Sequence, residues 1–310
     1  MSNISQRDAF WTRIYEIARQ DRDVVVISAD MGAPALDDFR RDLPSQFVNV
    51  GIAEQNAILV ASGLCMTGKK VFVYAIAPFI VLRCLEQTRV LNAIMDNPIT
   101  IVGVGAGFGY EDSGPTHHIT EDIAIMRSMP RIGVNSITDR VMASAFATLS
   151  CRMKSTNYVR LERQVLPDLY DENSDFSKGL SVLKDSKDCY IISTGSMTHV
   201  SLKIAEKLET EGISVGCIDL FTFPINSDLL VEKVKGVKKL ITLEEHFLPG
   251  GLGSAVCEVL MDNEILIPVK RIGLSTEKKY CYKYGGREVI RSYYGLDYKG
   301  IERQIGKFLI

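Results

Sequence analysis

Short β-rich runs alternate with amphipathic, helix-forming segments along this chain of 310 residues. The runs are residues 23–30, 70–77 and 99–107 in the first half, and residues 189–196, 213–220, 239–246 and 269–274 in the second half. Apolar runs of this kind predict strands buried on both faces of a parallel sheet, with helices as the crossover connections. We therefore predict an α/β fold of two three-layer α/β/α domains with mostly parallel sheets.

A polar segment without helical or strand periodicity, residues 165–179, separates the two halves and contains Pro167. The chain is long enough for two domains of ordinary size. We place the domains at residues 1–170 and 186–310, with a linker at residues 171–185.

Charge and composition argue against several classes of protein. A formal net charge of −2 gives no electrostatic reason to expect binding to nucleic acid or to an anionic membrane. The first 20 residues are charged throughout, and no later apolar run is long enough to span a membrane, so we predict a cytoplasmic protein. The seven cysteines are scattered without a CxxC pair, which predicts reduced, apolar thiols and no metal held by this chain.

One acidic residue, Glu54, stands in the first turn of a predicted helix within residues 49–64, and most of its neighbours are apolar. Gly51 permits a tight turn just before it. Two interpretations are open at this point. Glu54 can complement the positive end of the helix dipole, or it can be a partly desolvated carboxyl that holds or passes a proton near neutral pH.

The segment VGIAEQNA, residues 50–57, resembles the GIAEQ segment of thiamin-diphosphate enzymes of the transketolase and deoxyxylulose-phosphate synthase group. Further family segments follow in the expected order, over nearly the whole chain but over only the second half of a full-length transketolase. The resemblance implies that Glu54 hydrogen-bonds the N1′ atom of the cofactor's aminopyrimidine, so that the amino group acts as a base on the thiazolium carbon. It also implies a place in the cofactor site for Asp30, which ends the SAD segment.

Two further segments imply an aromatic and a histidine at this site. Residues 74–90 resemble the family segment whose aromatic residue packs on the aminopyrimidine, and Phe79 is the match, although it is also suited to an ordinary core position. Residues 111–130 resemble the GPTH loop and the following helix, so His117 is implied to contact substrate oxygens and to act in catalysis. The pair of adjacent histidines leaves a metal site as an alternative, but neighbouring residues do not converge easily on one ion.

Two arginines are candidates for binding a sugar phosphate. Residues 158–167 resemble the family segment that carries a phosphate-binding arginine, and Arg163 is the match. Arg7 lies as far ahead of Asp30 as a phosphate-binding arginine does in transketolases. A guanidinium fork suits a phosphate, but Arg163 can instead pair with Glu162, and Arg7 can be an exposed residue at the start of an amphipathic helix.

The chain departs from the transketolase pattern at three positions. Ser113 stands where the family has an aspartate that contacts the donor sugar, so Ser113 takes that place among the substrate-binding residues. Gly105 replaces a second histidine, and Pro34 replaces a serine. These changes predict that acceptor recognition differs from that of the ordinary pentose-phosphate enzyme.

No GDG segment occurs in the sequence, although enzymes of this group bind the cofactor's diphosphate through Mg²⁺ held by that segment and by a later asparagine. Because Mg²⁺ needs oxygen ligands, we infer a partner chain that carries the diphosphate-binding domain. The resemblance implies an α2β2 assembly, in which this chain also associates with its own copy through the C-terminal domain.

In the second half, the resemblance implies a domain that stabilises the dimer and carries little chemistry. The glycines of residues 250–253 predict close packing of a strand against a helix, because their spacing does not fit a dinucleotide fingerprint. Glu245 and His246 at the end of a strand can reach the mouth of the active site, or His246 can be a loop histidine with internal hydrogen bonds.

Together these features predict the C-terminal subunit of a thiamin-diphosphate-dependent, transketolase-like enzyme that transfers a two-carbon ketol unit from a ketose phosphate to an aldose. Two alternatives stay open. One is a subunit that decarboxylates 2-oxoacids or resembles deoxyxylulose-phosphate synthase, and the other is a non-catalytic assembly subunit.

Overall fold

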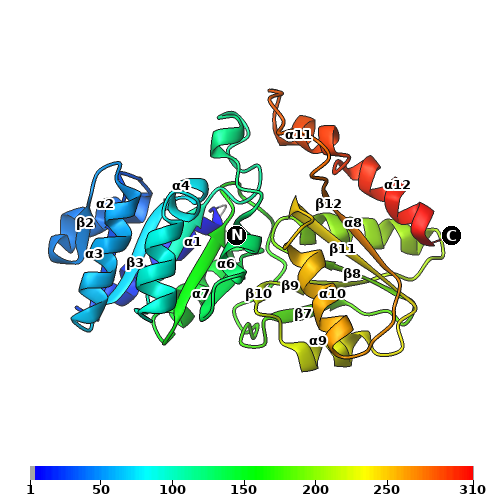
Figure 1. Cartoon of the computed structure of the whole chain (residues 1–310), viewed down its shortest axis with the longest axis horizontal. Helices are drawn as coiled ribbons and strands as arrows, with labels where there is room; N and C mark the ends of the chain where they lie inside the picture. Colours follow the sequence, from blue (N-terminus) through cyan, green and yellow to red (C-terminus); the bar gives the residue numbers. More distant parts are fainter. Residues whose placement is uncertain (1–3, 310) are drawn as a thin grey trace.

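The computed structural model describes residues 4–309 and has two sheets, each covered by helices on both faces (Figure 1). The first is a seven-stranded sheet of order β10-β5-β6-β4-β3-β1-β2. Its strands are β1 (Val24–Ser28), β2 (Phe47–Asn49), β3 (Lys70–Ile76), β4 (Thr100–Val104), β5 (Ile132–Ser136), β6 (Thr156–Leu161) and β10 (Thr222–Phe223). All pairs in this sheet are parallel except β10 with β5, which confirms the predicted type of sheet.

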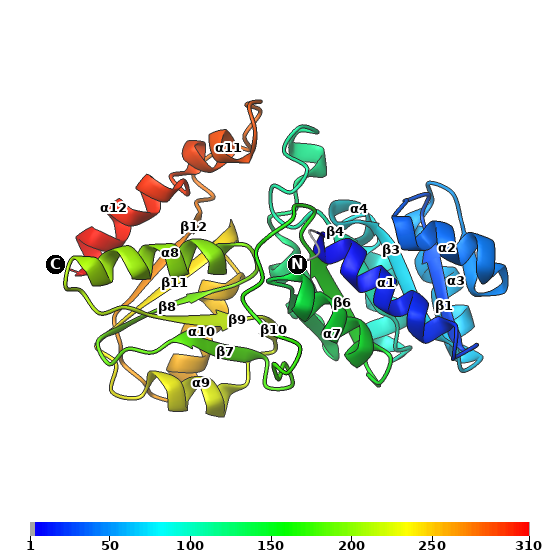
Figure 2. The ribbon, with the colours of Figure 1, turned by 180° about the vertical axis from the view of Figure 1, so that it is seen from behind.

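Helices from the first half of the chain divide between the two faces of this sheet. One face is covered by α1 (Gln6–Ala18), α2 (Pro34–Asp42) and α7 (Arg140–Ser150), and the other by α3 (Glu54–Met66), α4 (Ala77–Val81) and α6 (Asp122–Arg127). Figure 2 shows α1 and α7 in front of the sheet. Shorter helical turns are η1 (Pro44–Gln46), α5 (Leu85–Gln87), the π-helical η2 (Thr88–Ile94) and η3 (Pro115–His117).

The apolar alternation within β3 explains why both of its faces are buried. Phe72 and Tyr74 point to the side of α1, where the ring centre of Phe72 lies 6.2 Å from that of Phe10 and Tyr74 lies 5.0 Å from Trp11. The residues between them, such as Val73, point to the side of α3. Successive side chains of a strand face opposite sides, so a continuous apolar run fills two cores at once.

The second sheet has five strands in the order β12-β11-β8-β9-β7. They are β7 (Leu180–Lys184), β8 (Cys189–Ser193), β9 (Gly216–Leu220), β11 (Lys239–Phe247) and β12 (Val269–Leu274), and only the pair β7–β9 is antiparallel. One face is covered by α8 (Met197–Thr210), α11 (Arg287–Tyr294) and α12 (Tyr298–Leu309), and the other by α9 (Ser227–Val234) and α10 (Leu252–Asp262). The segment predicted as linker, residues 171–185, thus contains β7.

The two halves of the chain share the first sheet. Strand β10 leaves the second unit and pairs with β5, with Thr222 opposite Asn135 and Phe223 opposite Val134. Phe223 is buried in the core on the α3 side of this sheet. The first sheet is therefore completed by residues that lie far beyond the predicted domain boundary.

The glycines before and within α10 allow the close packing that the sequence predicted. A Cβ atom at Gly251 would overlap the carboxylate of Glu244, and one at Gly253 would lie 2.6 Å from Oγ1 of Thr242. Glu244 accepts hydrogen bonds from the backbone N–H groups of Leu252 and Gly253 at 2.7 and 2.8 Å. Burial raises the pKa of Glu244 to about 7, even though these donors favour the charged form.

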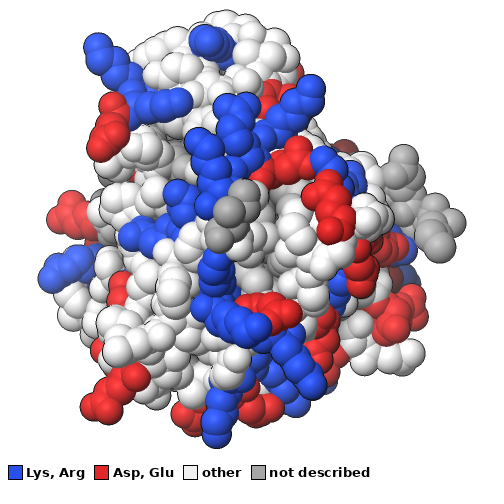
Figure 3. Space-filling model, turned by 90° about the vertical axis from the view of Figure 1, so that its right-hand side faces the viewer, with Lys and Arg blue, Asp and Glu red and all other residues white. Residues whose placement is uncertain are grey.

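The surface at the C-terminal end of the molecule carries lysines and arginines in a band, with acidic side chains on both sides of it (Figure 3). Across residues 4–309, no helix combines the length and the apolar character that crossing a membrane would require.

The shared strand predicts a stability contribution from Phe223. Replacing Phe223 with Ala removes a fully buried ring, and we expect the free energy of unfolding to fall by about 3–5 kcal/mol. Urea unfolding of the isolated chain measures this change. Tyr282→Ala, at a side chain that is 76% exposed, is the matched control and should stay within about 0.5 kcal/mol of the wild type. Equal values for the two variants would contradict this account of β10.

Candidate active site

The strand order creates a switch point at the carboxyl ends of β1 and β3. The chain passes from β1 to β2 at the edge of the sheet and then returns to the other side of β1 to form β3. In open parallel sheets, ligands bind outside the carboxyl ends of the strands at such a point. Asp30, Glu54, Phe79, His117 and Arg163 all lie in the segments that directly follow strand ends on this edge. The topology therefore places these five predicted site residues at one edge of the sheet, where the carboxyl ends of the strands lie.

Side-chain contacts join several of these residues into a row. Arg83 donates a hydrogen bond from Nη1 to Oε2 of Glu54 at 2.6 Å, and its guanidinium carbon lies 4.5 Å from the ring centre of Phe79. The ring of His117 meets Phe79 edge to face, with 5.1 Å between ring centres. Glu54 is only 3% exposed, and Arg83 is its counter-ion.

Tyr110 extends this row toward the two predicted phosphate ligands. Its ring centre lies 6.2 Å from that of His117, and the guanidinium of Arg163 lies 4.9 Å from it. Burial raises the pKa of Tyr110, while the positive charges of Arg163 and Arg7 act in the opposite direction. Arg163, in the segment after β6, thus lies over the ring of Tyr110, whereas Arg7, in α1, donates from Nε to Oδ1 of Asp8 at 2.8 Å.

Arg83 is a site residue that the sequence analysis missed. A signal was present, because Arg83 follows Phe79 by four residues, and residues four apart lie on the same side of a helix. The spacing does not show that Glu54, at the start of α3, lies close enough to pair with Arg83.

Asp30 and Ser113 are exposed and make local contacts. Asp30 has a positive φ of 58° and exchanges hydrogen bonds with Asn49, at 3.1 Å between the side chains and 3.2 Å from its own N–H. It therefore ties the loop after β1 to the end of β2. Ser113 lies in the turn between Tyr110 and His117, and its N–H donates to the carbonyl of Tyr110 at 3.0 Å.

The two adjacent histidines face different surroundings. His117 Nδ1 lies 3.0 Å from Oγ1 of Thr116 at the partly exposed end of the loop. His118 is buried against Phe108, with 5.2 Å between ring centres, and burial lowers the pKa of His118. No group of three His, Cys, Asp or Glu side chains among residues 4–309 is arranged to hold a metal ion.

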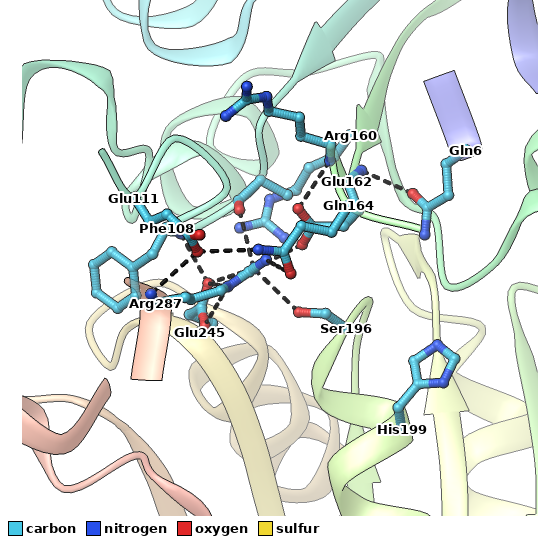
Figure 4. A network of polar contacts seen from close by, with 12 residues as sticks. Gln6, Phe108, Glu111, Arg160, Glu162, Gln164, Ser196, His199, Glu245 and Arg287 are labelled. Carbon is cyan, nitrogen blue, oxygen red and sulfur yellow. Dashed lines mark hydrogen bonds and ion pairs between the residues drawn. The ribbon is translucent and has the colours of Figure 1, made fainter. Parts of the chain in front are cut away.

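A buried ionic network that the sequence analysis did not predict joins the first unit to the second (Figure 4). Nη2 of Arg287, at the start of α11, lies 2.6 Å from Oε2 of Glu162 and 2.6 Å from Oε1 of Glu245. Glu245 also pairs with Arg291 and accepts a hydrogen bond from the N–H of Phe108 at 2.8 Å. This contact fixes the loop that carries Tyr110 and His117 onto the second sheet.

Glu245 and His246, the two strand-end residues considered in the sequence analysis, are both buried and make contacts within the chain. Glu245 is buried within the network, and His246 is a buried histidine whose Nδ1 lies 2.6 Å from the carbonyl oxygen of Phe247. Burial acts to raise the pKa of Glu245, but the charges of Arg287 and Arg291 outweigh burial and hold it at about 2. In return, Glu162 and Glu245 raise the pKa of Arg287 against the opposite effect of burial.

Comparisons with known proteins cover both halves of the chain. The family model "Transketolase, pyrimidine binding domain" matches residues 2–168, and "Transketolase, C-terminal domain" matches residues 179–301. The chain is 36% identical over 303 residues to an apulose-4-phosphate transketolase subunit of Phocaeicola vulgatus, an alignment that covers 96% of this chain and 95% of that protein. It is 30% identical over 301 residues to a 6-deoxy-6-sulfo-D-fructose transketolase subunit of Clostridium sp. (strain MSTE9), with 96% and 92% covered.

A solved structure of a split-gene transketolase, described as an inactive beta4 tetramer, is also similar to this chain. The two superpose with a TM-score of 0.86 at 32% sequence identity, over 99% of this chain and 98% of that one.

The ionic network predicts how stability depends on pH. The pKa of Glu245 is held at about 2 in the folded chain, against a usual value of 4.5. The folded state is thus favoured above pH 4.5, and this contribution is lost as the pH falls from about 4.5 toward 2. Glu245→Gln should lose about 3–5 kcal/mol at pH 7 and show a shallower decline below pH 4.5, measured by urea unfolding at pH 7, 4.5 and 3.

Glu258→Gln, at an exposed partner of Arg127, is the control and should keep the wild-type decline. An undiminished decline in Glu245→Gln would show that this carboxylate does not carry the effect.

Proposed function

This chain belongs to the transketolase family, and we propose that it is the C-terminal-type subunit of a two-component, thiamin-diphosphate-dependent enzyme that transfers a two-carbon ketol unit. The observation that carries the proposal is the row Glu54–Arg83–Phe79–His117 at the switch point of the first sheet. A buried carboxylate beside a partly exposed aromatic ring is a suitable pair for a flat heterocycle with a ring nitrogen.

The chemistry of Glu54 and Phe79 fits the aminopyrimidine half of thiamin diphosphate. When bound, the cofactor supplies the electron sink for breaking the carbon–carbon bond of the donor sugar. Glu54 would hydrogen-bond a ring nitrogen of the cofactor, because Arg83 contacts Oε2 of this carboxylate and leaves Oε1 for that partner. Phe79 packs against the ring, and Asp30 belongs to the rim of the same site.

The substrate lies on the other side of this row. His117 contacts substrate oxygens beside the reacting carbon. Its Nδ1 lies beside Oγ1 of Thr116, so Nε2 is the ring nitrogen that serves this contact. Arg163 and Arg7 bind the phosphate of the sugar, since both offer a guanidinium fork and Arg163 lies over the ring of Tyr110 beside His117. Ser113 is close to the sugar hydroxyls.

A second chain supplies the diphosphate-binding domain and its Mg²⁺. The absence of a GDG segment from the sequence is the reason for this proposal. Two relatives are named as subunits, and the solved tetramer of beta chains alone is described as inactive. We propose a cytoplasmic α2β2 assembly that acts on a ketose phosphate and an aldose. Because of Ser113, Gly105 and Pro34, its recognition of the acceptor differs from that of the ordinary pentose-phosphate enzyme.

Glu54→Gln tests the proposal in the complex of this chain with its partner. We expect turnover of a ketose phosphate to fall by at least about 100-fold, because proton transfer through the aminopyrimidine is lost. Thiamin-diphosphate-dependent cleavage of xylulose 5-phosphate, with pyruvate as a competing donor, is the assay. Glu86→Gln, at an exposed acid of α5, is the control and should keep full turnover. Full activity of Glu54→Gln, or a preference for pyruvate, would refute the proposal.

Arg163→Gln tests the phosphate site separately. Loss of a charged hydrogen-bond donor should raise KM for the phosphorylated donor by about 10- to 100-fold, and the kinetics with an unphosphorylated ketose should stay unchanged. The exposed Arg152→Gln is the control. A similar change in KM for both ketoses would assign Arg163 to another role.

A further inference from the structure

Arg287 is the residue through which the second unit of the chain contacts both substrate-facing segments of the first. Its guanidinium pairs with Glu162, and Nη2 also lies 3.3 Å from the carbonyl oxygen of Ala106. Its backbone N–H donates to Oε2 of Glu111 at 3.1 Å, and the same oxygen accepts a bond from Gln164 at 3.0 Å. One arginine therefore joins the segment after β4 to the segment after β6.

The partners of Arg287 are immediate neighbours of the proposed phosphate ligands. Glu162 precedes Arg163, and its Oε1 accepts a hydrogen bond from the N–H of Arg163 at 2.8 Å. The N–H of Glu162 in turn donates to Oε1 of Gln6 at 2.8 Å, and Gln6 precedes Arg7. Glu162 thus links the backbone N–H of Arg163 to the side chain of Gln6, the residue before Arg7.

The centre of the network is buried, and each of its charges lies beside an opposite charge. Glu162 and Glu245 are 1% and 4% exposed, and Arg287 is 6% exposed. Glu245 accepts hydrogen bonds from both Nε and Nη2 of Arg287, so the planar guanidinium orients this carboxylate, and Glu162 is held by its ion pair with Nη2. A buried carboxylate without its partner would carry a large desolvation cost, which disfavours alternative arrangements.

We propose that Arg287 is a positioning residue for the phosphorylated end of the substrate. Through Glu162 it sets the spacing of Arg163 and Arg7, and through Glu245 and Glu111 it holds the loop with Tyr110 against them. The second unit of the chain therefore determines affinity for the sugar phosphate without touching it. This inference rests on the proposed function, in which the two arginines bind phosphate.

Arg291 provides a matched control within the same network. It pairs with Glu245 from the next turn of α11, and its other ion pair is with the exposed Glu288. In Arg291→Gln one cation leaves Glu245, but the bond between Arg287 and Glu162 is kept. Arg287→Lys keeps the positive charge but loses the planar fork, so this variant changes the geometry of the network without removing the cation beside Glu162 and Glu245.

The first test measures hydrogen exchange on the isolated chain and does not depend on activity. In Arg287→Lys we expect faster exchange, by about tenfold or more, in peptides covering residues 105–112 and 160–165. In Arg291→Gln the exchange of residues 160–165 should match that of the wild type. Equal loosening of residues 160–165 in both variants, or none in Arg287→Lys, would overturn the positioning role.

The second test measures kinetics of the complex with the partner chain. We expect Arg287→Lys to raise KM for xylulose 5-phosphate about tenfold, with kcat within about twofold of the wild type and with unchanged KM for unphosphorylated xylulose. A fall in kcat with both ketoses, or loosened segments with unchanged KM, would overturn the inference. If the wild-type complex itself shows no cofactor-dependent cleavage, the proposed function fails, and the exchange experiment alone then decides whether Arg287 orders these segments.

Discussion

The parallel direction of β1, β2, β3, β4 and β6 is the constraint on which the site depends. Parallel strands are joined by crossover connections, so all of these strands end at the same edge of the sheet. The residues that follow each strand therefore also lie at that edge. Residues that lie more than a hundred positions apart, such as Asp30 and Arg163, therefore share one side of the sheet. The return of the chain past β1 then opens the place between β1 and β3 where Glu54 and Phe79 approach each other.

The site also depends on charges that are satisfied across the junction of the two units. Glu54 is neutralised by Arg83 from the first unit alone, whereas Glu162 is neutralised by Arg287 from the second. The ion pair of Glu54 is thus local to one unit, whereas that of Glu162 needs both units. In the proposed function, this difference gives the second unit an influence on the segment that carries Arg163.

Much of this arrangement could be predicted from the sequence, since strand runs, their alternation with helices and the order of short motifs are local properties. Glu54, Phe79 and His117 could be named because each lies in a short motif that resembles a family segment, and Phe79 and His117 also follow predicted strands. The partners Arg83 and Arg287 could not, because pairing is decided by which helix ends meet in space. Strand β10 has only two residues and carries no periodicity, so nothing in the sequence indicated that it would pair with β5 of the first sheet.

The pairing of β10 with β5 has a consequence for the order in which the chain folds during synthesis. Strand β5 keeps an open edge until Phe223 has left the ribosome, which places completion of the first sheet after three strands of the second have been made. The first sheet therefore lacks this edge strand while only the first unit has been made, and an unprotected edge is a place where nascent chains associate wrongly. Chaperone contact during this interval would protect that edge of the nascent chain.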